Sequence, residues 1–204
     1  MKYALLALTW MLWCFCHSVL ISMRVTGYLK QRLGERFRFY RLAYNGFALV
    51  TLIPVVLYAN SMEGEPLFSW EGYWRVVQVL LLAASVFLFV AGARHYDALS
   101  FLGLRQLRDR DSCVGLTESC GLNTSGILGV MRHPWYAGGM MIIWARDLNV
   151  SVIVTNVILT SYFILGTLLE ERKLSNEFPV IYKGYQQRVS MFFPYRWLIS
   201  KWDR

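Results

Sequence analysis

The sequence lacks the residue groupings that hold a structural metal. Its only histidines are scattered along the chain: His17, His95 and His133. None of its four cysteines stands at zinc spacing from a histidine. The cysteines are Cys14, Cys16, Cys113 and Cys120. The first two fall in an apolar run, and the last two fall in a polar stretch where we expect reduced thiols. We therefore expect no bound metal.

Charge is also scarce, and long apolar runs take its place. Charged residues make up 17% of the 204 residues, whereas hydrophobic residues make up 56% and the mean hydropathy is +0.37. A soluble domain of this length does not need so many apolar residues. A membrane-spanning helix needs about 20 mostly apolar residues. Four runs approach or exceed this length: 3–23, 42–59, 76–93 and 150–169.

One further apolar run, 135–148, is shorter. It is apolar as far as Ala145 and then meets Arg146 and Asp147. A helix over this run would cover about 21 Å, less than the ~30 Å of hydrocarbon in a bilayer. We interpret it as a short fifth span. The predicted fold class is therefore all-α: a polytopic membrane protein with about five transmembrane helices.

The net charge of +8 is distributed in a way that indicates a membrane rather than a nucleic acid. All but three of the 21 Lys and Arg residues fall in 24–41, 94–132 and 172–204, whereas the loop 60–73 is acidic. Basic loops on alternate sides follow the positive-inside rule. This pattern predicts an outside N-terminus, a cytoplasmic C-terminus and a location in the cell inner membrane. Nucleic acid is a poor explanation of the charge.

We expect a single domain, 1–204, without a cleaved signal peptide, because the first apolar run is too long and no small-x-small cleavage site precedes the basic block. Two cytoplasmic segments stand out. Residues 97–131 are polar and glycine-rich, and too many for a plain connection. The tail after the last span is basic and rich in Trp and Tyr, which is typical of an interfacial helix on anionic lipid. A second role as a lid is compatible with this.

The tripeptide Arg132-His133-Pro134 precedes the short run 135–148. Proline suits the first position of a helix, because its missing N–H would have no intrahelical partner. Arg132 and His133 would then lie at the mouth of the helix, where the helix dipole favours an anion such as a carboxylate or a phosphate. Alternatively, Arg132 is a positive-inside anchor and His133 a polar helix cap. Local physics leaves both open.

The pair Glu170-Glu171 follows the last apolar run directly. Two carboxylates at the C-terminal end of a helix oppose its dipole and face an anionic leaflet. One interpretation is that a carboxylate meets a cation, such as the ammonium group of an amino-acid-like cofactor. The other is a solvated collar in which Glu170 pairs with Lys173, and the residues alone favour it.

At these two motifs the sequence resembles a known family. GILGVMRHPWYAGG (126–139) and EERKLSNEFPVIYKGYQQRVSMFFP (170–194) are similar to the isoprenylcysteine carboxyl methyltransferase and phospholipid methyltransferase group of membrane proteins. The matched positions are Arg132, His133, Pro134, Tyr136, Gly138, Glu170, Glu171, Leu174, Phe178, Tyr182, Tyr185, Arg188 and Pro194. Pro179 and Ser190 depart from the pattern. The first half, through FCHSVLIS (15–22), resembles bacterial branches that include thiol S-methyltransferases and NnrU-like proteins.

The resemblance implies S-adenosylmethionine as the cofactor, held by the region 122–194. Its carboxylate would meet Arg132 or the nearby helix N-terminus, and its ammonium would meet Glu170 or Glu171. The implied cofactor-binding residues are Gly126, Arg132, His133, Tyr136, Glu170, Glu171 and Tyr185. The candidate catalytic residues are Arg132, Tyr136, His17 and Arg188.

The function implied is an integral membrane methyltransferase acting on a small or lipophilic acceptor, either a prenylcysteine-like carboxylate or a thiol, that arrives from membrane lipid. A thiol must lose a proton, and His17, His133 and the two glutamates are the available bases. Three alternatives stay open: an enzyme specific for small thiols, an NADPH-dependent sterol reductase-like enzyme, and a non-enzymatic membrane scaffold. Adjacent carboxylates disfavour the reductase, because they repel a dinucleotide phosphate.

Overall fold

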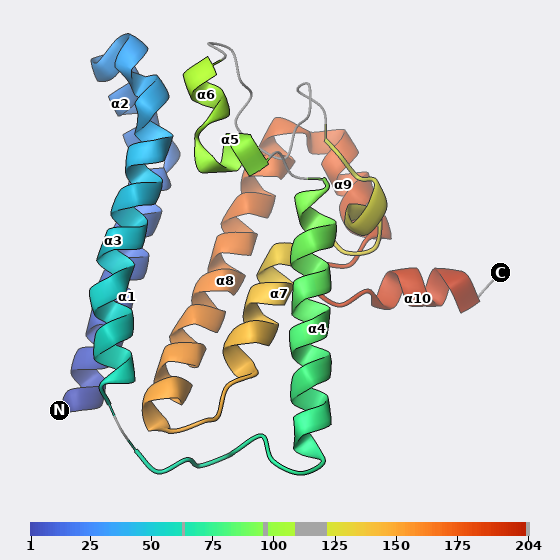
Figure 1. Ribbon diagram of the computed structural model, residues 1–204. Helices are drawn as coiled ribbons and strands as arrows, with labels where there is room; N and C mark the ends of the chain where they lie inside the picture. The colour runs from blue at the N-terminus through green and yellow to red at the C-terminus, as the bar shows by residue number, and fades with distance from the viewer. Residues whose placement is uncertain (63, 96–97, 109–121, 203–204) are drawn as a thin grey trace. The chain divides into compact units, whose positions relative to one another are not determined.

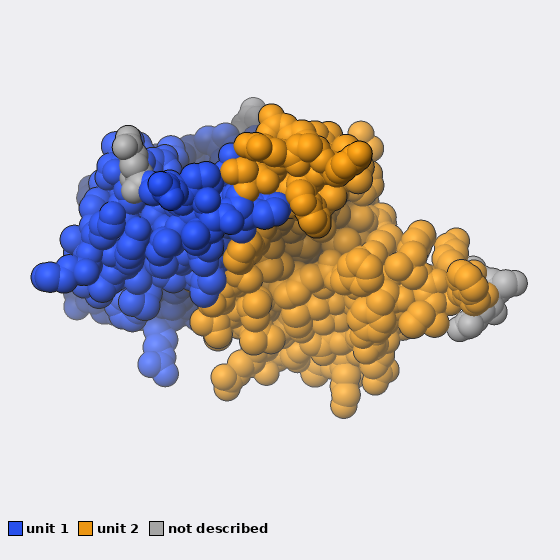
Figure 2. Space-filling view, turned by 90° about the horizontal axis from the view of Figure 1, so that it is seen from below, with its two compact units in different colours: residues 1–68, 98–115, 147–158 blue, residues 69–97, 116–146, 159–204 orange. Residues whose placement is uncertain are grey.

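The computed structural model describes residues 1–62, 64–95, 98–108 and 122–202 (Figure 1). Cys113 and Cys120, for which we expect reduced thiols, lie outside these residues. The chain divides into two compact units, which Figure 2 shows in different colours. The first unit contains Met1–Phe68, Ala98–Gly115 and Asp147–Ile158, and the second contains Ser69–Asp97, Leu116–Arg146 and Leu159–Arg204.

The first unit is built around two long apolar helices. Its elements are α1 (Lys2–Ile21), α2 (Met23–Leu33), η1 (Gly34–Phe39), α3 (Tyr40–Asn60), α5 (Ala98–Leu102) and α6 (Arg105–Arg108). Helix α1 ends at Ser22, whose extended backbone breaks the helix and whose side chain caps α2 by accepting from the Val25 N–H. Trp13 Nε1 donates to the Ala48 carbonyl at 3.2 Å, and Tyr40 Oη donates to the Leu20 carbonyl at 2.6 Å. These two bonds fasten α1 to α3.

The second unit contains the regions that carry both sequence motifs. Its elements are α4 (Trp74–Ala93), η3 (Gly126–Gly129), α7 (Pro134–Trp144), α9 (Pro179–Arg188) and α10 (Tyr195–Trp202), together with most of α8 (Val150–Glu177). Ser85 Oγ on α4 donates to the Gly138 carbonyl on α7 at 2.9 Å, and Trp135 Nε1 donates to the Phe89 carbonyl at 3.1 Å. A Cβ added at Gly138 would lie 3.3 Å from the Ser85 carbonyl oxygen. The missing side chain therefore lets α4 and α7 approach closely.

The prediction of a polytopic helical membrane protein is confirmed. Among the described residues, four helical stretches are long and apolar enough to cross a membrane: Lys2–Ile21, Met23–Asn60, Trp74–Ala93 and Val150–Glu177. Each contains most or all of one predicted run. The part of the chain that the structure describes has no β-strand and only two isolated β-bridges, Phe68 with Leu148 and Met131 with Ser190.

Helix α7 covers less of the predicted short span 135–148 than expected. It begins at Pro134, as predicted, and ends at Trp144 after 11 residues. Its length is about 16 Å, well short of the hydrocarbon thickness of a bilayer. Gln78 Nε2 donates a hydrogen bond to the Ala145 carbonyl at 2.7 Å, and Trp70 Nε1 donates one to the Arg146 carbonyl at 3.0 Å. Side chains thus satisfy the carbonyls at the helix end. A total of five spans and the orientation of the termini stay predictions.

Candidate functional site

The Arg-His-Pro motif lies where the chain enters α7. The Arg132 N–H donates to the Ser190 carbonyl at 2.9 Å, and the His133 N–H donates to the Met191 carbonyl at 3.1 Å. Pro134 then occupies the first turn of α7, with His133 as the N-cap residue. The His133 side chain makes no capping hydrogen bond. Its imidazole is therefore available for another role, and the motif is anchored to the segment that follows α9.

Arg132 and Glu171 form a buried ion pair. Arg132 Nε donates to Glu171 Oε1 at 2.7 Å, and the two side chains are only 8% and 9% exposed. Arg132 Nη1 also donates to the carbonyls of Gln186, at 3.2 Å, and Val189. These carbonyls end α9, where the helix dipole favours a cation. Arg132 therefore joins α8 to the C-terminal end of α9. The two residues expected to bind opposite charges of a cofactor are partners of one another.

His133 lies between the two glutamates. Its Nε2 is 3.1 Å from Glu171 Oε1, its Nδ1 is 3.8 Å from Glu170 Oε2, and its side chain is 2% exposed. An ionised carboxylate only accepts hydrogen bonds, so Nε2 carries the proton in its contact with Glu171. Nδ1 is then the atom that faces Glu170. The position of the imidazole makes it a link between the buried glutamate and its neighbour.

The two adjacent glutamates differ in environment. Glu171 accepts hydrogen bonds from Arg132 and, at 2.9 Å, from Gln186 Nε2. The Glu170 side chain is 30% exposed and has the His133 imidazole beside it. Glu171 is therefore committed to the protein interior, whereas Glu170 is the carboxylate that a ligand can reach.

Aromatic rings surround this ion cluster. The Tyr136 ring meets the His133 imidazole edge-on with centroids 5.7 Å apart, and it meets Phe163 at 6.1 Å. Tyr136 also lies over Gly166, where an added Cβ would be 3.6 Å from its ring. Gly166 is one turn before Glu170 on α8. Tyr136 is thus held near the glutamate pair by both α7 and α8.

The two tyrosines of α9 are buried beneath the cluster. Tyr185 Oη donates to the Leu128 carbonyl at 2.6 Å, which ties α9 to η3. Tyr182 is 1% exposed, and its hydroxyl finds no hydrogen-bond partner among the described residues. Burial raises the pKa of both phenols, and the Glu171 carboxylate raises the pKa of Tyr182 further. An unpartnered buried hydroxyl close to two carboxylates is rare enough in folded proteins to require an explanation.

The remaining predicted site residues are placed differently. Gly126 begins η3 with φ +55°, and an added Cβ would overlap the His95 imidazole. This glycine is therefore explained by backbone conformation and space. Arg188 is exposed, donates from Nε to the Gly184 carbonyl at 3.2 Å, and lines a pocket between α9 and α10. Neither residue makes a hydrogen bond to the Arg132–Glu171 pair.

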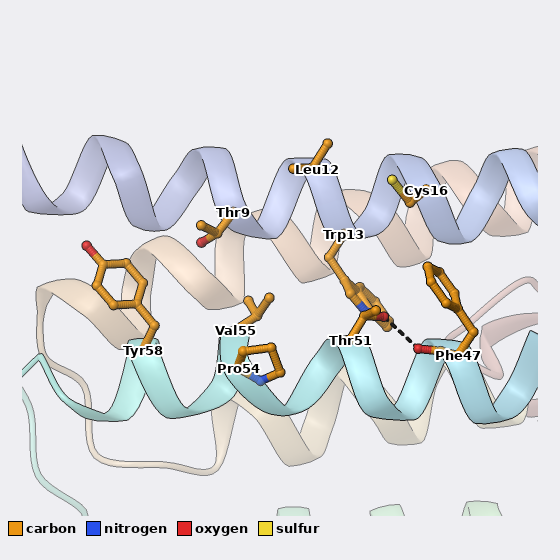
Figure 3. A pocket seen from close by; sticks show the side chains of 9 residues that line it. All are labelled: Thr9, Leu12, Trp13, Cys16, Phe47, Thr51, Pro54, Val55 and Tyr58. Carbon is orange, nitrogen blue, oxygen red and sulfur yellow. Dashed lines mark hydrogen bonds between the residues drawn. The ribbon is translucent and has the colours of Figure 1, made fainter.

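His17 belongs to the first unit, whereas all the other predicted site residues belong to the second. Its Nε2 is 2.6 Å from Tyr44 Oη, and its ring lies 5.1 Å from the Trp13 ring. Trp13 also lines a mostly apolar pocket of about 360 Å³ between α1 and α3 (Figure 3). Figure 3 shows the Trp13 side chain from α1 and the Phe47 side chain from α3 facing this space. No predicted site residue lines it.

Sequence reasoning missed two contributors to the site, Gln186 and Arg196. Gln186 donates to Glu171, while its carbonyl accepts from Arg132 and, at 3.1 Å, from Arg196 Nη1. The sequence identifies Tyr182 as a position of the family motif but indicates no role for it. Gln186 directly follows the motif residue Tyr185, which is the one sequence signal that could have pointed to it.

These features define a multi-pass helical membrane protein with a buried ion cluster between α7, α8 and α9. A family model described as "NnrU protein" matches residues 5–175. The chain therefore belongs to the NnrU protein family.

Curated relatives add a chemical activity to this comparison. A methanethiol S-methyltransferase from Pseudomonas sp. (strain GM41) is 35% identical over 82 residues, which cover 40% of this chain and 32% of the relative. One from Pseudomonas deceptionensis is 38% identical over 66 residues, 32% of this chain and 25% of the relative. Methanethiol S-methyltransferase 1 from Bradyrhizobium diazoefficiens is 37% identical over 67 residues, 32% of this chain and 24% of the relative. The chain thus spans a third or less of these relatives. No solved structure shows a significant match.

Proposed function

We propose that the chain is an integral membrane methyltransferase that transfers a methyl group from S-adenosylmethionine to a small thiol. The names of the relatives support a thiol rather than a prenylcysteine-like carboxylate as the acceptor. The observation that carries the proposal is the asymmetry of the glutamate pair. Glu171 is buried against Arg132, while Glu170 beside it is 30% exposed.

The charges of the cluster fit such a cofactor. Arg132 and Glu171 offset each other, so Glu170 leaves an excess negative charge when the His133 imidazole is neutral. S-adenosylmethionine carries an ammonium, a carboxylate and a sulfonium, and is a cation overall. A half-buried site with excess negative charge favours a cation. Glu170 would hold the ammonium group, and the cofactor supplies an electrophilic methyl carbon when bound.

The other residues of the cluster hold Glu170 in position and keep water away. Arg132 and Gln186 fix Glu171, and thereby the last turns of α8, against α9. The rings of Tyr136 and Phe192 lie beside the His133 ring, with centroids 5.7 Å and 6.2 Å from it. A thiol acceptor must lose its proton before it attacks. His133 Nδ1, 3.8 Å from Glu170 Oε2, can take up that proton.

The location belongs to the same proposal. The cofactor is a cytosolic metabolite, and the positive-inside pattern supports a cytoplasmic position in the inner membrane for the end of α8. We infer that the cofactor enters from water and that the thiol, being apolar and small, reaches the site from lipid or water. The single domain 1–204 remains part of this proposal.

The test uses the full chain purified in detergent. Thermal unfolding is followed with S-adenosylhomocysteine, with NADPH and without ligand. Methyl transfer is then measured with radiolabelled S-adenosylmethionine and methanethiol, ethanethiol or a farnesylcysteine analogue. We expect stabilisation by S-adenosylhomocysteine alone and label in the sulfides formed from the short thiols. Stabilisation by NADPH alone would favour the reductase, and binding of neither ligand would favour a scaffold.

A further inference from the structure

Helix α10 is amphipathic, but it exposes its apolar face, which a helix of a soluble protein would pack against the core. Four of its apolar residues recur at intervals of three and four, which places them on one face, and all four are exposed: Tyr195 46%, Leu198 48%, Ile199 56% and Trp202 91%. The other face carries Arg196, Trp197, Ser200 and Lys201. None of the four residues of this apolar face is buried by the described part of the second unit.

Arg196, on the polar face of α10, fastens the start of this helix to the protein. The Arg196 N–H donates to Ser190 Oγ at 3.1 Å, and Arg196 Nη1 donates to the carbonyls of Gln186, at 3.1 Å, and Gln187. These bonds hold the start of α10 against the C-terminal end of α9. Within the second unit, α10 runs across the direction of α4 in Figure 1. Since α4 is long and apolar enough to cross a membrane, this direction suits a helix that lies in the membrane plane.

A pocket of about 250 Å³ opens between α9, α10 and the loop around η3. We call it the α9–α10 pocket. The residues that line it include Thr124, Arg188, Trp197 and Ser200. The Ser200 hydroxyl donates to the Trp197 carbonyl at 2.9 Å, which leaves its oxygen free to accept. Trp197 and Ser200 belong to the polar face of α10. The pocket therefore lies on the side of α10 opposite to its apolar face.

Of the residues that line the pocket, Arg188 is the charged one. Residues 178–202 contain Lys183, Arg188, Arg196 and Lys201 and no Asp or Glu. Residues 122–133 also contain no acidic residue. Arg196 is engaged with the end of α9, whereas Arg188 is exposed at the pocket. A guanidinium suits a phosphate group.

We propose that the α9–α10 pocket binds the phosphate group of an anionic membrane lipid, whose acyl chains lie along the apolar face of α10. A lipid fits both faces of the helix at once, because its phosphate is at headgroup level and its chains begin just below. A soluble phosphate fits the pocket but leaves the apolar face uncovered. This assignment gives Arg188 a role in lipid binding, and it does not depend on the proposed methyl transfer.

The experiment measures binding of short-chain lipids to the full chain in a neutral detergent by native mass spectrometry. The probes are dioctanoyl phosphatidylglycerol, dioctanoyl phosphatidylcholine and inorganic phosphate. The variants are Arg188→Gln and, as a control with the same loss of charge on the same helix, Lys183→Gln, which lies outside the pocket. We expect Arg188→Gln to weaken phosphatidylglycerol binding by ~5-fold or more, because a basic side chain near an anionic lipid contributes about that much. Lys183→Gln should bind like the wild type.

A second variant separates the lipid from other anions. Ile199→Ser on the apolar face should weaken phosphatidylglycerol binding without changing any binding of inorganic phosphate. If Arg188→Gln and Lys183→Gln weakened phosphatidylglycerol binding equally, the proposal would be overturned, because the lipid would then be attracted by the overall positive charge and not by the pocket. Equal affinity for inorganic phosphate and phosphatidylglycerol would overturn it in favour of a soluble anion. Displacement of the lipid by S-adenosylhomocysteine would assign the pocket to the cofactor instead.

Discussion

Arg132 Nε lies 2.7 Å from Glu171 Oε1 in a pair that is almost completely buried. The pair joins the segment before α7 to α8, and the Arg132 contacts with the end of α9 bring a third helix into the same cluster. Because Glu171 is engaged in this way, the partly exposed Glu170 is left for a ligand. The division of roles between the two glutamates follows from this one contact.

The ion pair should contribute to folding. We expect Arg132→Met to lower the free energy of unfolding by about 3–5 kcal/mol, because Glu171 would remain charged and buried without its partner. Arg172→Met, which removes an exposed arginine next to Glu171, is the control and should change stability little. Denaturant unfolding in detergent measures both. The double variant Arg132→Met/Glu171→Leu should recover part of the loss; a wild-type value for Arg132→Met would contradict the role of the pair.

Glu170 should bind the cofactor without supporting the fold. We expect Glu170→Gln to weaken S-adenosylhomocysteine binding by at least ~10-fold, which corresponds to the low end for a hydrogen bond to a charged group. The unfolding temperature without ligand should not fall. Glu177→Gln, at the exposed end of the same helix, is the matched control. Titration calorimetry measures the affinities, and an undiminished affinity in Glu170→Gln would remove the proposed ammonium site.

The two buried tyrosines of α9 should respond differently to the loss of their hydroxyls. Tyr185→Phe removes the bond to the Leu128 carbonyl and should cost about 1 kcal/mol of stability. Tyr182→Phe removes a hydroxyl that has no partner among the described residues, so it should be neutral or stabilising. Unfolding in the absence of ligand measures both. A clear loss of stability in Tyr182→Phe would contradict this prediction. Unchanged stability together with weaker cofactor binding would show that the buried hydroxyl contacts the ligand.

Stability should fall at alkaline pH, and Tyr185 should contribute to the decline. Burial raises the pKa of its phenol above the ordinary value of 10.0. The unfolded chain therefore loses this proton first, so the stabilisation is complete below about pH 10 and is lost as the pH rises toward the raised pKa. We expect a shallower decline of the unfolding temperature in Tyr185→Phe than in the wild type between about pH 9 and 11. Parallel curves for the two proteins would show that another group dominates.

Much of the architecture could be predicted because its causes are local. The run 150–169 carries no charge, and α8 spans it, since a helix satisfies its own backbone within lipid. Pro134 begins α7, as its missing N–H predicts. The end of α7 was harder to predict. It depends on Gln78 and Trp70, which are distant in sequence and bind the carbonyls that follow Trp144.

The sequence predicted most of the residues of the candidate site but not which of them form an ion pair. Opposite charges at 132 and at 170–171 indicated an anion site and a cation site, whereas the structure pairs Arg132 with Glu171. The bond from Gln186 to Glu171 had no pattern to predict it, because side-chain direction on α9 depends on how α9 packs. The place of Arg188 at the α9–α10 pocket likewise required the positions of two helices.

The sequence by itself determined that this chain forms long apolar helices with basic segments between them, because those features depend on the transfer of each residue into lipid and on the period of one helix. Only the tertiary structure decided which of two adjacent glutamates is buried. Residues 170 and 171 are about 100° apart around α8, so one faces Arg132 and Gln186 while the other stays partly exposed. That choice depends on the rotation of α8 against α7 and α9, which the packing of whole helices sets.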